Sequence, residues 1–414
     1  MTLPSTRFAA LPAGVVEADQ SVTHPRGFRA AGIHAGVKKK YRDLGLLHSE
    51  RPCVSAAVFT TNAAAAAPVR LTRGSSHCDR LRAVVVNSGN ANACTGKGGL
   101  GDAAQMRRVA ADALALQPEE VAVASTGIIG VPLPIAKIAV GIDKAAKRLA
   151  ASGGPDFAAA IRTTDRTAKE GAFTLELPAG EVRVGLAAKG AGMISPAMAT
   201  MLCFLTTDAT FPPAAVGDLL RRVVDATFNR VTVDGQQSTN DTVLLLANGA
   251  SGIEVAGPDL EVFEEALRAA LLGLAVALVA DGEGSTKTVR LRVEGAWDEP
   301  EAERVARAVA DSPLVKAAFF GGDPNWGRVM QATGQVIDGA GGAGLRAEVA
   351  YEGISVVRQG EGVDLARGER RRLRDAMQGS EIDVLLALQR GECTATVYFS
   401  DLTYDYVTVN SEYN

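Results

Sequence analysis

The spacing of apolar and polar positions predicts strands and helices that alternate along the chain. Short runs rich in β-branched residues and bounded by turn residues predict strands at 54–60, 82–86, 121–124, 242–247, 288–294, 347–351 and 394–399. Apolar residues recurring every three or four positions predict helices at 102–116, 134–150, 155–161, 213–229 and 259–280. A hairpin is expected at 173–185, an irregular structure in the first fifty residues, and a β-rich tail at 404–410. This mixture, without a low-complexity linker, predicts an α/β protein.

The composition is that of an ordinary globular protein. Of 414 residues, 47% are hydrophobic and 22% are charged, and the length allows two domains or one large one. The net charge of −4 provides no basic field for nucleic acid or for an anionic membrane. The longest apolar run, 269–280, is far shorter than the roughly 20 residues that span a bilayer. The first residues also lack the apolar core of a signal peptide.

The cysteines and histidines argue against several kinds of site. The five cysteines are odd in number and form no C-x-x-C pair, which disfavours a zinc ribbon or a disulfide framework. A reducing compartment, and therefore the cytoplasm, is expected. All four histidines precede residue 78, and none has a recognisable catalytic context. A Ser-His-Asp triad and a histidine-rich metal site are thus disfavoured, and an enzyme built on this chain is expected to use another base.

The stretch 189–208 has the composition expected around an unusual nucleophile. A glycine-rich start and a run of small residues lead to Thr200, and an apolar, strand-like run follows at once. If the bond between Ala199 and Thr200 is cut, Thr200 carries a hydroxyl nucleophile beside a free α-amine. Such an amine has a pKa of about 7.7–8.0, so near neutral pH it can accept the proton of the hydroxyl. The structural alternative is an ordinary threonine that begins a strand.

The same stretch, KGAGMISPAMATMLCFLTTD, resembles the self-cleavage segment of the ornithine acetyltransferase (ArgJ) family, also called glutamate N-acetyltransferase. Further matches follow in family order: VFTTN at 58–62, NSGNANACTG at 87–96, STGIIG at 125–130, STNDT at 238–242, DGEG at 281–284, DPNWGR at 323–328, and Asn410. Together they span nearly the whole chain. The resemblance implies a layered α/β fold of the type shared with self-processing aminopeptidases such as DmpA, with two mixed β-sheets packed between helices.

The resemblance also implies the catalytic residues. Thr200 would act as the nucleophile, with its α-amine as the base after cleavage at Ala199. The hydroxyl of Thr126 and the backbone N–H of Gly127 would form the oxyanion hole; without the resemblance, a plain turn explains these two residues equally well. Residues 1–199 would become an α chain and 200–414 a β chain, joined as an α₂β₂ heterotetramer.

Four further residues are implied as substrate ligands, with Thr200 itself as a fifth. Lys189 would anchor the substrate carboxylate, although a lysine beside glycines is more often a solvated loop cation. Glu283 would bind the amino end of ornithine, or it merely caps a turn. Thr163 would contact substrate, although the neighbouring Thr164 is an alternative. Asn410 would be a ligand supplied by the C-terminal region.

The resemblance implies ping-pong transfer of acetyl from N²-acetyl-L-ornithine through Thr200 to L-glutamate, within arginine biosynthesis. It requires no metal and no tightly bound cofactor, and it leaves open whether acetyl-CoA is also a donor. Two departures from the family pattern make a paralogue with a changed acceptor, in specialised metabolism, the alternative to this function. Gln236 and Gln237 stand where the family usually has an acid, and the chain stops at Asn414, before the terminal Thr or Ser that commonly follows Asn410.

Other functions remain as alternatives. A hydrolase of the related aminopeptidase type would pass the acyl group to water, and an uncut paralogue would serve only as a binding subunit. The run GKGGLG at 96–101 matches a dinucleotide-binding fingerprint, but about ten residues separate it from the preceding strand, where the fingerprint needs an immediate turn. The lysines at 38–40 are expected to form a solvated turn. Trp326 and Arg328 are expected to form a structural lock or a site wall.

Overall fold

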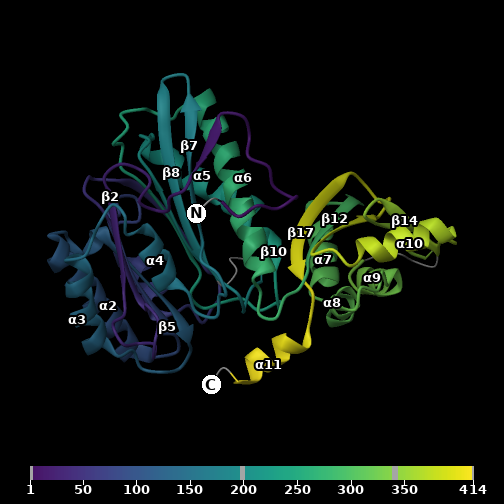
Figure 1. The fold of residues 1–414 in the computed structure, drawn as a ribbon, viewed down its shortest axis with the longest axis horizontal. Coiled ribbons are helices and arrows are strands. Elements are labelled where there is room, and N and C mark those ends of the chain that lie inside the picture. The colour runs from purple at the N-terminus through teal and green to yellow at the C-terminus, as the bar shows by residue number, and fades with distance from the viewer. Residues whose placement is uncertain (1–2, 196–200, 338–343, 413–414) are drawn as a thin grey trace. The chain divides into compact units, whose positions relative to one another are not determined.

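The computed structural model describes residues 3–195, 201–337 and 344–412 (Figure 1). The chain divides into two compact units. Unit 1 comprises residues 1–229 and 236–278, and unit 2 comprises residues 230–235 and 279–414. Ala199 and Thr200 lie outside the described residues, so the covalent division into 1–199 and 200–414 stays a prediction.

Unit 1 contains two mixed sheets. The six-stranded sheet has the order β1 (Val15–Ala18), β7 (Lys169–Leu177), β8 (Gly180–Lys189), β9 (Leu202–Thr207), β11 (Thr242–Ala247) and β4 (Val54–Phe59). The four-stranded sheet has the order β2 (Phe28–Ile33), β3 (Leu44–Ser49), β5 (Ala83–Asn90) and β6 (Val121–Ile128). One neighbouring pair in each sheet is parallel, β9 with β11 and β5 with β6.

Helices cover the two sheets of unit 1. They are α1 (Ala67–Ser75), α2 (Gly96–Leu114), α3 (Ile135–Ala146), α4 (Gly154–Ile161), α5 (Pro213–Ala226) and α6 (Pro258–Ala280). α2 and α3 pack on one face of the four-stranded sheet, and α5 packs on β4 of the other sheet (Figure 1). The facing sides of both sheets share one core with α4, in which Phe157 meets Phe204 edge-on at 5.3 Å between ring centroids.

Unit 2 is built on one mixed sheet of seven strands. Their order is β10 (Val231–Thr232), β17 (Cys393–Ser400), β12 (Thr288–Ala296), β16 (Glu381–Ala387), β13 (Glu348–Tyr351), β14 (Ile354–Arg358) and β15 (Glu361–Gly362). The helices are α7 (Glu299–Ala310), α8 (Pro313–Phe320), α9 (Trp326–Gly334), α10 (Arg367–Ala376) and α11 (Tyr404–Glu412). α7 packs on β12 and β17, and the apolar face of the sheet forms the core of this unit.

The mixed α/β architecture is confirmed, and unit 1 has the two sheets between helices that the resemblance implied. A third sheet, in unit 2, adds to that expectation. Two sequence-based expectations were wrong. The first fifty residues contain β1, β2 and β3, and the tail is the helix α11 rather than a strand, because the Thr403 hydroxyl accepts the Tyr406 N–H at 3.2 Å and caps the helix. None of the helices in the described part of the chain has the length and apolar character of a membrane span.

Candidate functional site

Two of the implied site residues meet at the end of the four-stranded sheet. Thr126 lies near the end of β6, and Lys189 is the last residue of β8. Both side chains are buried, and Lys189 Nζ donates a hydrogen bond to Thr126 Oγ1 at 3.3 Å. Tertiary packing therefore joins residues 63 positions apart in the sequence.

Gly127 occupies a position that only glycine fits. Its φ of +135° lies in a region that other residues rarely adopt, and a Cβ there would lie 2.3 Å from the carbonyl carbon of Gly89. The pairing of β5 with β6 becomes irregular at Gly89 and Asn90, where the two backbones approach closely. Close packing alone therefore explains the glycine, and its role in an oxyanion hole stays a prediction.

Asp165 connects the implied residues, and the sequence had not marked it as part of the site. Its buried Oδ1 accepts hydrogen bonds from Lys169 Nζ and from the Gly190 N–H, both at 2.7 Å. Its Oδ2 accepts the Thr163 N–H at 3.0 Å and lies 3.9 Å from Lys189 Nζ. Burial alone would raise the pKa of Asp165, but the ammonium groups of Lys189 and Lys169 hold that pKa well below its usual range. Asp165 is thus a buried anion that fixes the start of the segment leading to Thr200.

Thr163 lines a cationic pocket of about 370 Å³, in which the side chains of Lys38, Arg42 and Arg162 outnumber one carboxylate, that of Asp165. Lys38 Nζ reaches inward and donates to the Arg162 carbonyl at 2.9 Å. Burial lowers the pKa of Lys38 to about 8. The expected solvated turn therefore describes the exposed lysines at 39 and 40, but not Lys38. A pocket with this lining suits a carboxylate or another small anion.

Asp241, within the STNDT motif, holds the first described residue after Thr200. Its carboxylate is fully buried, and Oδ1 accepts the Met201 N–H at 2.9 Å. Its Oδ2 has no hydrogen-bond partner among the described residues, although Ser238 is near enough to favour the charged form. Burial raises the pKa of Asp241 well above its usual value, and the Met201 N–H and Lys189 oppose that rise only in part.

The residue before Asp241 ties the same motif to the four-stranded sheet. Asn240 Nδ2 donates to the carbonyl of Ala91 at 2.7 Å and to that of Ser125 at 2.9 Å. Ser125 directly precedes Thr126. The STNDT motif thus binds Met201 through Asp241 and the end of β6 through Asn240. It therefore connects the two sheets of unit 1 beside the candidate site.

In unit 2 the structure brings together the other two implied ligands. Asn410, on α11, donates from Nδ2 to Glu283 Oε2 at 2.9 Å. Gly284 has a φ of +69°, and a Cβ there would lie 2.4 Å from the Tyr406 nitrogen, so the DGEG turn needs glycine for α11 to start beside it. Thr126, Thr163 and Lys189 belong to unit 1, and that both sets serve one site stays a prediction.

Several motifs have structural explanations. The GKGGLG run forms the first turns of α2, and only its third glycine, Gly99, is closely packed, against Thr95 and Asn92. A Cβ at Gly98 or Gly101 would meet nothing within 4 Å, so the run lacks the close approaches that define a dinucleotide fingerprint.

The DPNWGR motif begins a helix. Asn325 caps α9 by accepting the Arg328 N–H, and the Arg328 guanidinium donates to the Leu314 carbonyl at 2.7 Å. The expected structural lock is thus confirmed for Arg328.

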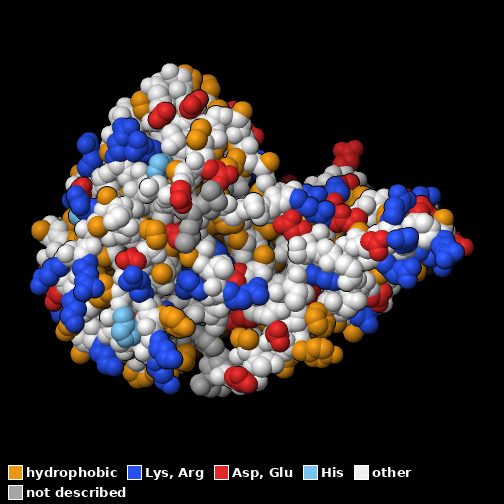
Figure 2. Space-filling view, viewed as in Figure 1, with side chains coloured by type: hydrophobic (Ala, Val, Ile, Leu, Met, Phe, Trp, Pro, Cys, Tyr) orange, Lys and Arg blue, Asp and Glu red, His pale blue; other side chains and the backbone are white. Residues whose placement is uncertain are grey.

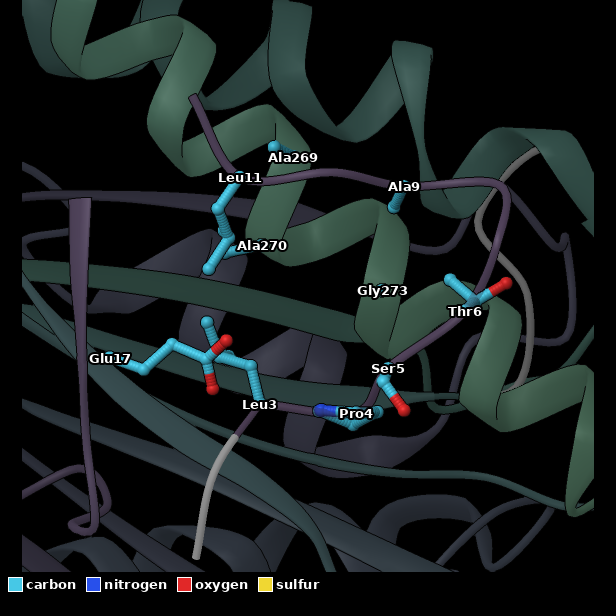
Figure 3. Close-up of a pocket in the computed structure, with 10 residues that line it drawn as sticks. All are labelled: Leu3, Pro4, Ser5, Thr6, Ala9, Leu11, Glu17, Ala269, Ala270 and Gly273. Atoms are coloured by element: carbon cyan, nitrogen blue, oxygen red, sulfur yellow. The ribbon is translucent and has the colours of Figure 1, made fainter. Parts of the chain in front are cut away.

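A smaller hollow in unit 1, of about 150 Å³, lies between the N-terminal segment and α6 (Figure 3). Leu3 and Leu11 contribute apolar walls, Gly273 lies on the helix, and Glu17 supplies a carboxylate. None of the implied site residues is among those that line it. The cationic pocket, by contrast, is lined by one of the implied site residues, Thr163.

Comparison with known proteins gives a consistent result. A sequence model described as the ArgJ family matches residues 29–414. The arginine biosynthesis bifunctional protein ArgJ of Symbiobacterium thermophilum is 47% identical over 398 residues, covering 95% of this chain and 98% of that protein. The protein of the same name from Bacillus subtilis is 40% identical over 403 residues, covering 96% and 98%.

Solved structures also match. A crystal structure of arginine biosynthesis bifunctional protein ArgJ from Bacillus halodurans is 43% identical, covers 45% of this chain and 97% of its own, and has a TM-score of 0.42. Ornithine acetyltransferase from Mycobacterium tuberculosis, solved in complex with ornithine, is 40% identical, covers 44% and 98%, and has a TM-score of 0.41. The family model matches residues 29–414, and the two curated relatives are 47% and 40% identical over nearly the whole length of both chains. This chain therefore belongs to the ArgJ family.

Proposed function

We propose that this chain is a self-processing glutamate N-acetyltransferase that carries acetyl on Thr200 from N²-acetyl-L-ornithine to L-glutamate. Its membership in the ArgJ family makes it an acetyltransferase of arginine biosynthesis. The single structural observation that best supports the chemistry is the hydrogen bond from Lys189 to Thr126, beside the segment that leads to Thr200.

Processing comes first in the proposed sequence. The Thr200 hydroxyl attacks the carbonyl carbon of Ala199, and the peptide C–N bond breaks as the acyl group moves from nitrogen to oxygen. Water then hydrolyses the ester, which leaves a carboxylate on Ala199 and a free α-amine on Thr200. The products are the chains 1–199 and 200–414. The hydrogen bond from Met201 to Asp241 supports this scheme, because it restrains the backbone directly after Thr200.

Acetyl transfer follows by the same hydroxyl. The α-amine of Thr200 takes the hydroxyl proton while the oxygen attacks the acetyl carbonyl of acetylornithine. Thr126 Oγ1 accepts from the Lys189 ammonium, so its own O–H hydrogen is available to the developing oxyanion beside the Gly127 N–H. The C–N bond breaks, the proton passes to the leaving amine, and ornithine departs. Glutamate then attacks the threonine ester through its amine and leaves as N-acetylglutamate.

The charges of the two units support these substrates. The pocket formed by Lys38, Arg162 and Thr163 suits a glutamate carboxylate. Glu283, held by Asn410, suits the side-chain ammonium of ornithine. We further propose that acetyl-CoA is a second acetyl donor, which would fit the word bifunctional in the names of the curated relatives.

A paralogue with another acceptor is the alternative, because Gln236 and Gln237 stand in place of the usual acid. Gln237 connects this loop to the 58–62 motif, since its Nε2 donates to Thr61 Oγ1 at 2.7 Å and its carbonyl accepts from Asn62 at 2.9 Å. We further propose an α₂β₂ assembly in the cytoplasm, which fits five free cysteine thiols.

The intact mass of the purified protein under denaturing conditions tests this function. The wild type is expected to give two fragments that meet between Ala199 and Thr200, and Thr200→Ala a single chain. Acetyl transfer from acetylornithine to glutamate is then measured on both proteins. An uncut wild-type chain that transfers acetyl would contradict the role of the α-amine. Acetate release that does not depend on glutamate would instead indicate a hydrolase.

A further inference from the structure

Unit 2 contains a hollow of about 530 Å³ that the proposed chemistry does not use. Side chains from α9, β14, α10 and the loop before α10 line it, among them Trp326, Val356, Val363, Leu365, Arg370 and Arg374. This volume lies within the roughly 300–1,000 Å³ typical of small-molecule sites. The lining combines one large aromatic ring, an apolar floor and two guanidinium groups.

Trp326 packs closely on a neighbouring strand but remains accessible. It is the first residue of α9, and a Cβ at Gly362 would lie 2.6 Å from the ring atom Cζ2, so the indole edge rests directly on β15. The side chain is nevertheless 37% exposed. Its indole N–H makes no hydrogen bond among the described residues. A closely packed, partly exposed ring of this kind can stack on a planar ligand.

The arginines come from the basic helix α10, which contains five of them in ten residues. Figure 2 shows Lys and Arg side chains gathered over this helix. Arg370 and Arg374 lie four residues apart, on one face. The Arg370 guanidinium donates to the Leu365 carbonyl at 2.8 Å and pairs with Asp364. Arg374 forms no hydrogen bond or ion pair within the described part of the chain, although it lines the hollow.

We propose that this hollow binds a purine nucleoside that carries phosphate groups. The purine would stack on Trp326 above the apolar floor, and the phosphates would accept hydrogen bonds from Arg374 and from Arg370, which would exchange Asp364 for the ligand. Planar guanidinium groups pair well with phosphate oxygens, and aromatic side chains stack on bases. A purine offers Trp326 a larger stacking surface than a pyrimidine.

Two kinds of ligand contain a purine nucleoside that carries phosphate groups, namely coenzyme A and a free purine nucleotide. Coenzyme A would deepen the proposed function, and rests on it, by giving the enzyme a second acetyl donor. A free nucleotide would make the hollow a regulatory site. Both share the phosphorylated purine nucleoside, so the same residues recognise either one.

Tryptophan fluorescence of the full-length protein tests the proposal. The chain has two tryptophans, and Trp297 does not line the hollow, so Trp297→Phe leaves Trp326 as the reporter. This protein is titrated with coenzyme A, ATP and inorganic phosphate. Saturable quenching by coenzyme A or by ATP is expected, and the tighter of the two identifies the source. No quenching by either, or equal quenching by inorganic phosphate, would overturn the proposal.

Arginine variants separate this site from non-specific attraction to α10. Arg374→Ala is expected to weaken binding about tenfold or more, because it removes a charge-assisted hydrogen bond. Arg371→Ala is the matched control, since Arg371 is exposed, pairs with Asp375 and does not line the hollow. An equal effect of both variants would refute a specific site. Transfer from acetylornithine, measured on the same proteins, tests the proposed function separately and is expected to be unchanged in Arg374→Ala.

Discussion

The Met201 N–H donates a hydrogen bond to Asp241 Oδ1 at 2.9 Å, in a place where both groups are buried. This bond links the starts of β9 and β11, the parallel pair of the six-stranded sheet, whose register joins Leu202 to Thr242. Met201 is bonded covalently to Thr200, the proposed nucleophile. The position of the proposed chemistry therefore depends on a carboxylate 40 residues further along the chain.

Replacement of Asp241 tests that dependence. Asp241→Ala leaves the buried Met201 N–H without its acceptor, which is expected to cost about 1–3 kcal/mol in the free energy of unfolding and to slow processing. Asp241→Asn keeps an acceptor of similar shape and is expected to process faster than the alanine variant. Urea denaturation and the rate at which the precursor disappears measure the two effects. Equal processing rates for both variants would contradict a positioning role.

The same residue predicts a pH dependence of stability. Because the pKa of Asp241 is raised in the folded protein, the folded state binds more protons than the unfolded state above the ordinary pKa near 4, and stability falls as pH rises. Asp241→Asn removes this titration. The stability of the variant relative to the wild type is therefore expected to improve from pH 4 to pH 8. Urea midpoints across this range measure it, and a constant difference would count against the raised pKa.

Asp165→Asn is expected to be strongly destabilising. The substitution leaves the buried ammonium groups of Lys169 and Lys189 without their shared anion, a change that typically costs about 3–5 kcal/mol. Because the pKa of Asp165 is lowered in the folded protein, Asp165 stabilises the wild type at pH values above the ordinary pKa of an aspartate. This contribution to the free energy of unfolding is lost as the pH falls from there toward the lowered pKa. Asp156→Asn is the control, because its ion pair with Arg42 is exposed and is expected to contribute less than about 1 kcal/mol. Similar losses of stability in both variants would refute the role of Asp165 as the shared anion of the two buried lysines.

Thr126→Val tests the oxyanion hole. Valine keeps the size of the side chain but removes the hydroxyl, so kcat for acetyl transfer is expected to fall about 10²–10³-fold. Thr126→Ser keeps the hydroxyl and is expected to retain most activity. Steady-state kinetics with acetylornithine and glutamate measure both, on protein whose processing has been checked by mass. A valine variant with wild-type kcat would exclude Thr126 from the chemistry.

Lys38 predicts a pH effect on glutamate binding. Its pKa of about 8 means that the ammonium, which favours an anion in the pocket, is lost as pH rises through 8. The KM for glutamate is therefore expected to increase across this range in the wild type. Lys38→Gln is expected to raise the KM for glutamate about tenfold at pH 7 and to abolish the increase in KM near pH 8. Lys40→Gln serves as the control, because Lys40 is exposed. If the KM for glutamate still increases near pH 8 in Lys38→Gln, the titration belongs to another group.

The sequence by itself determined the family, the order of the motifs and most of the central strands. Runs such as 242–247 consist of residues that suit a buried strand, and the sequence around Thr200, Thr126 and Lys189 is distinctive over a few neighbouring positions. Local patterns of this kind need no knowledge of the rest of the fold. The pattern of 404–410, by contrast, favoured a strand, and the cap from Thr403 makes it helical.

Only the tertiary structure decided how the side chains are paired. Asp165 is a shared anion because Lys169, Gly190 and Lys189 all lie beside its carboxylate in the folded chain. Asp241 is a buried hydrogen-bond acceptor because β9 and β11 are neighbours in the sheet. Lys38 resembles its exposed neighbours in sequence, yet its ammonium turns toward the Arg162 carbonyl 124 residues away. Burial and charge depend on contacts between residues distant in sequence, so pKa values and ion pairs are properties of the folded chain.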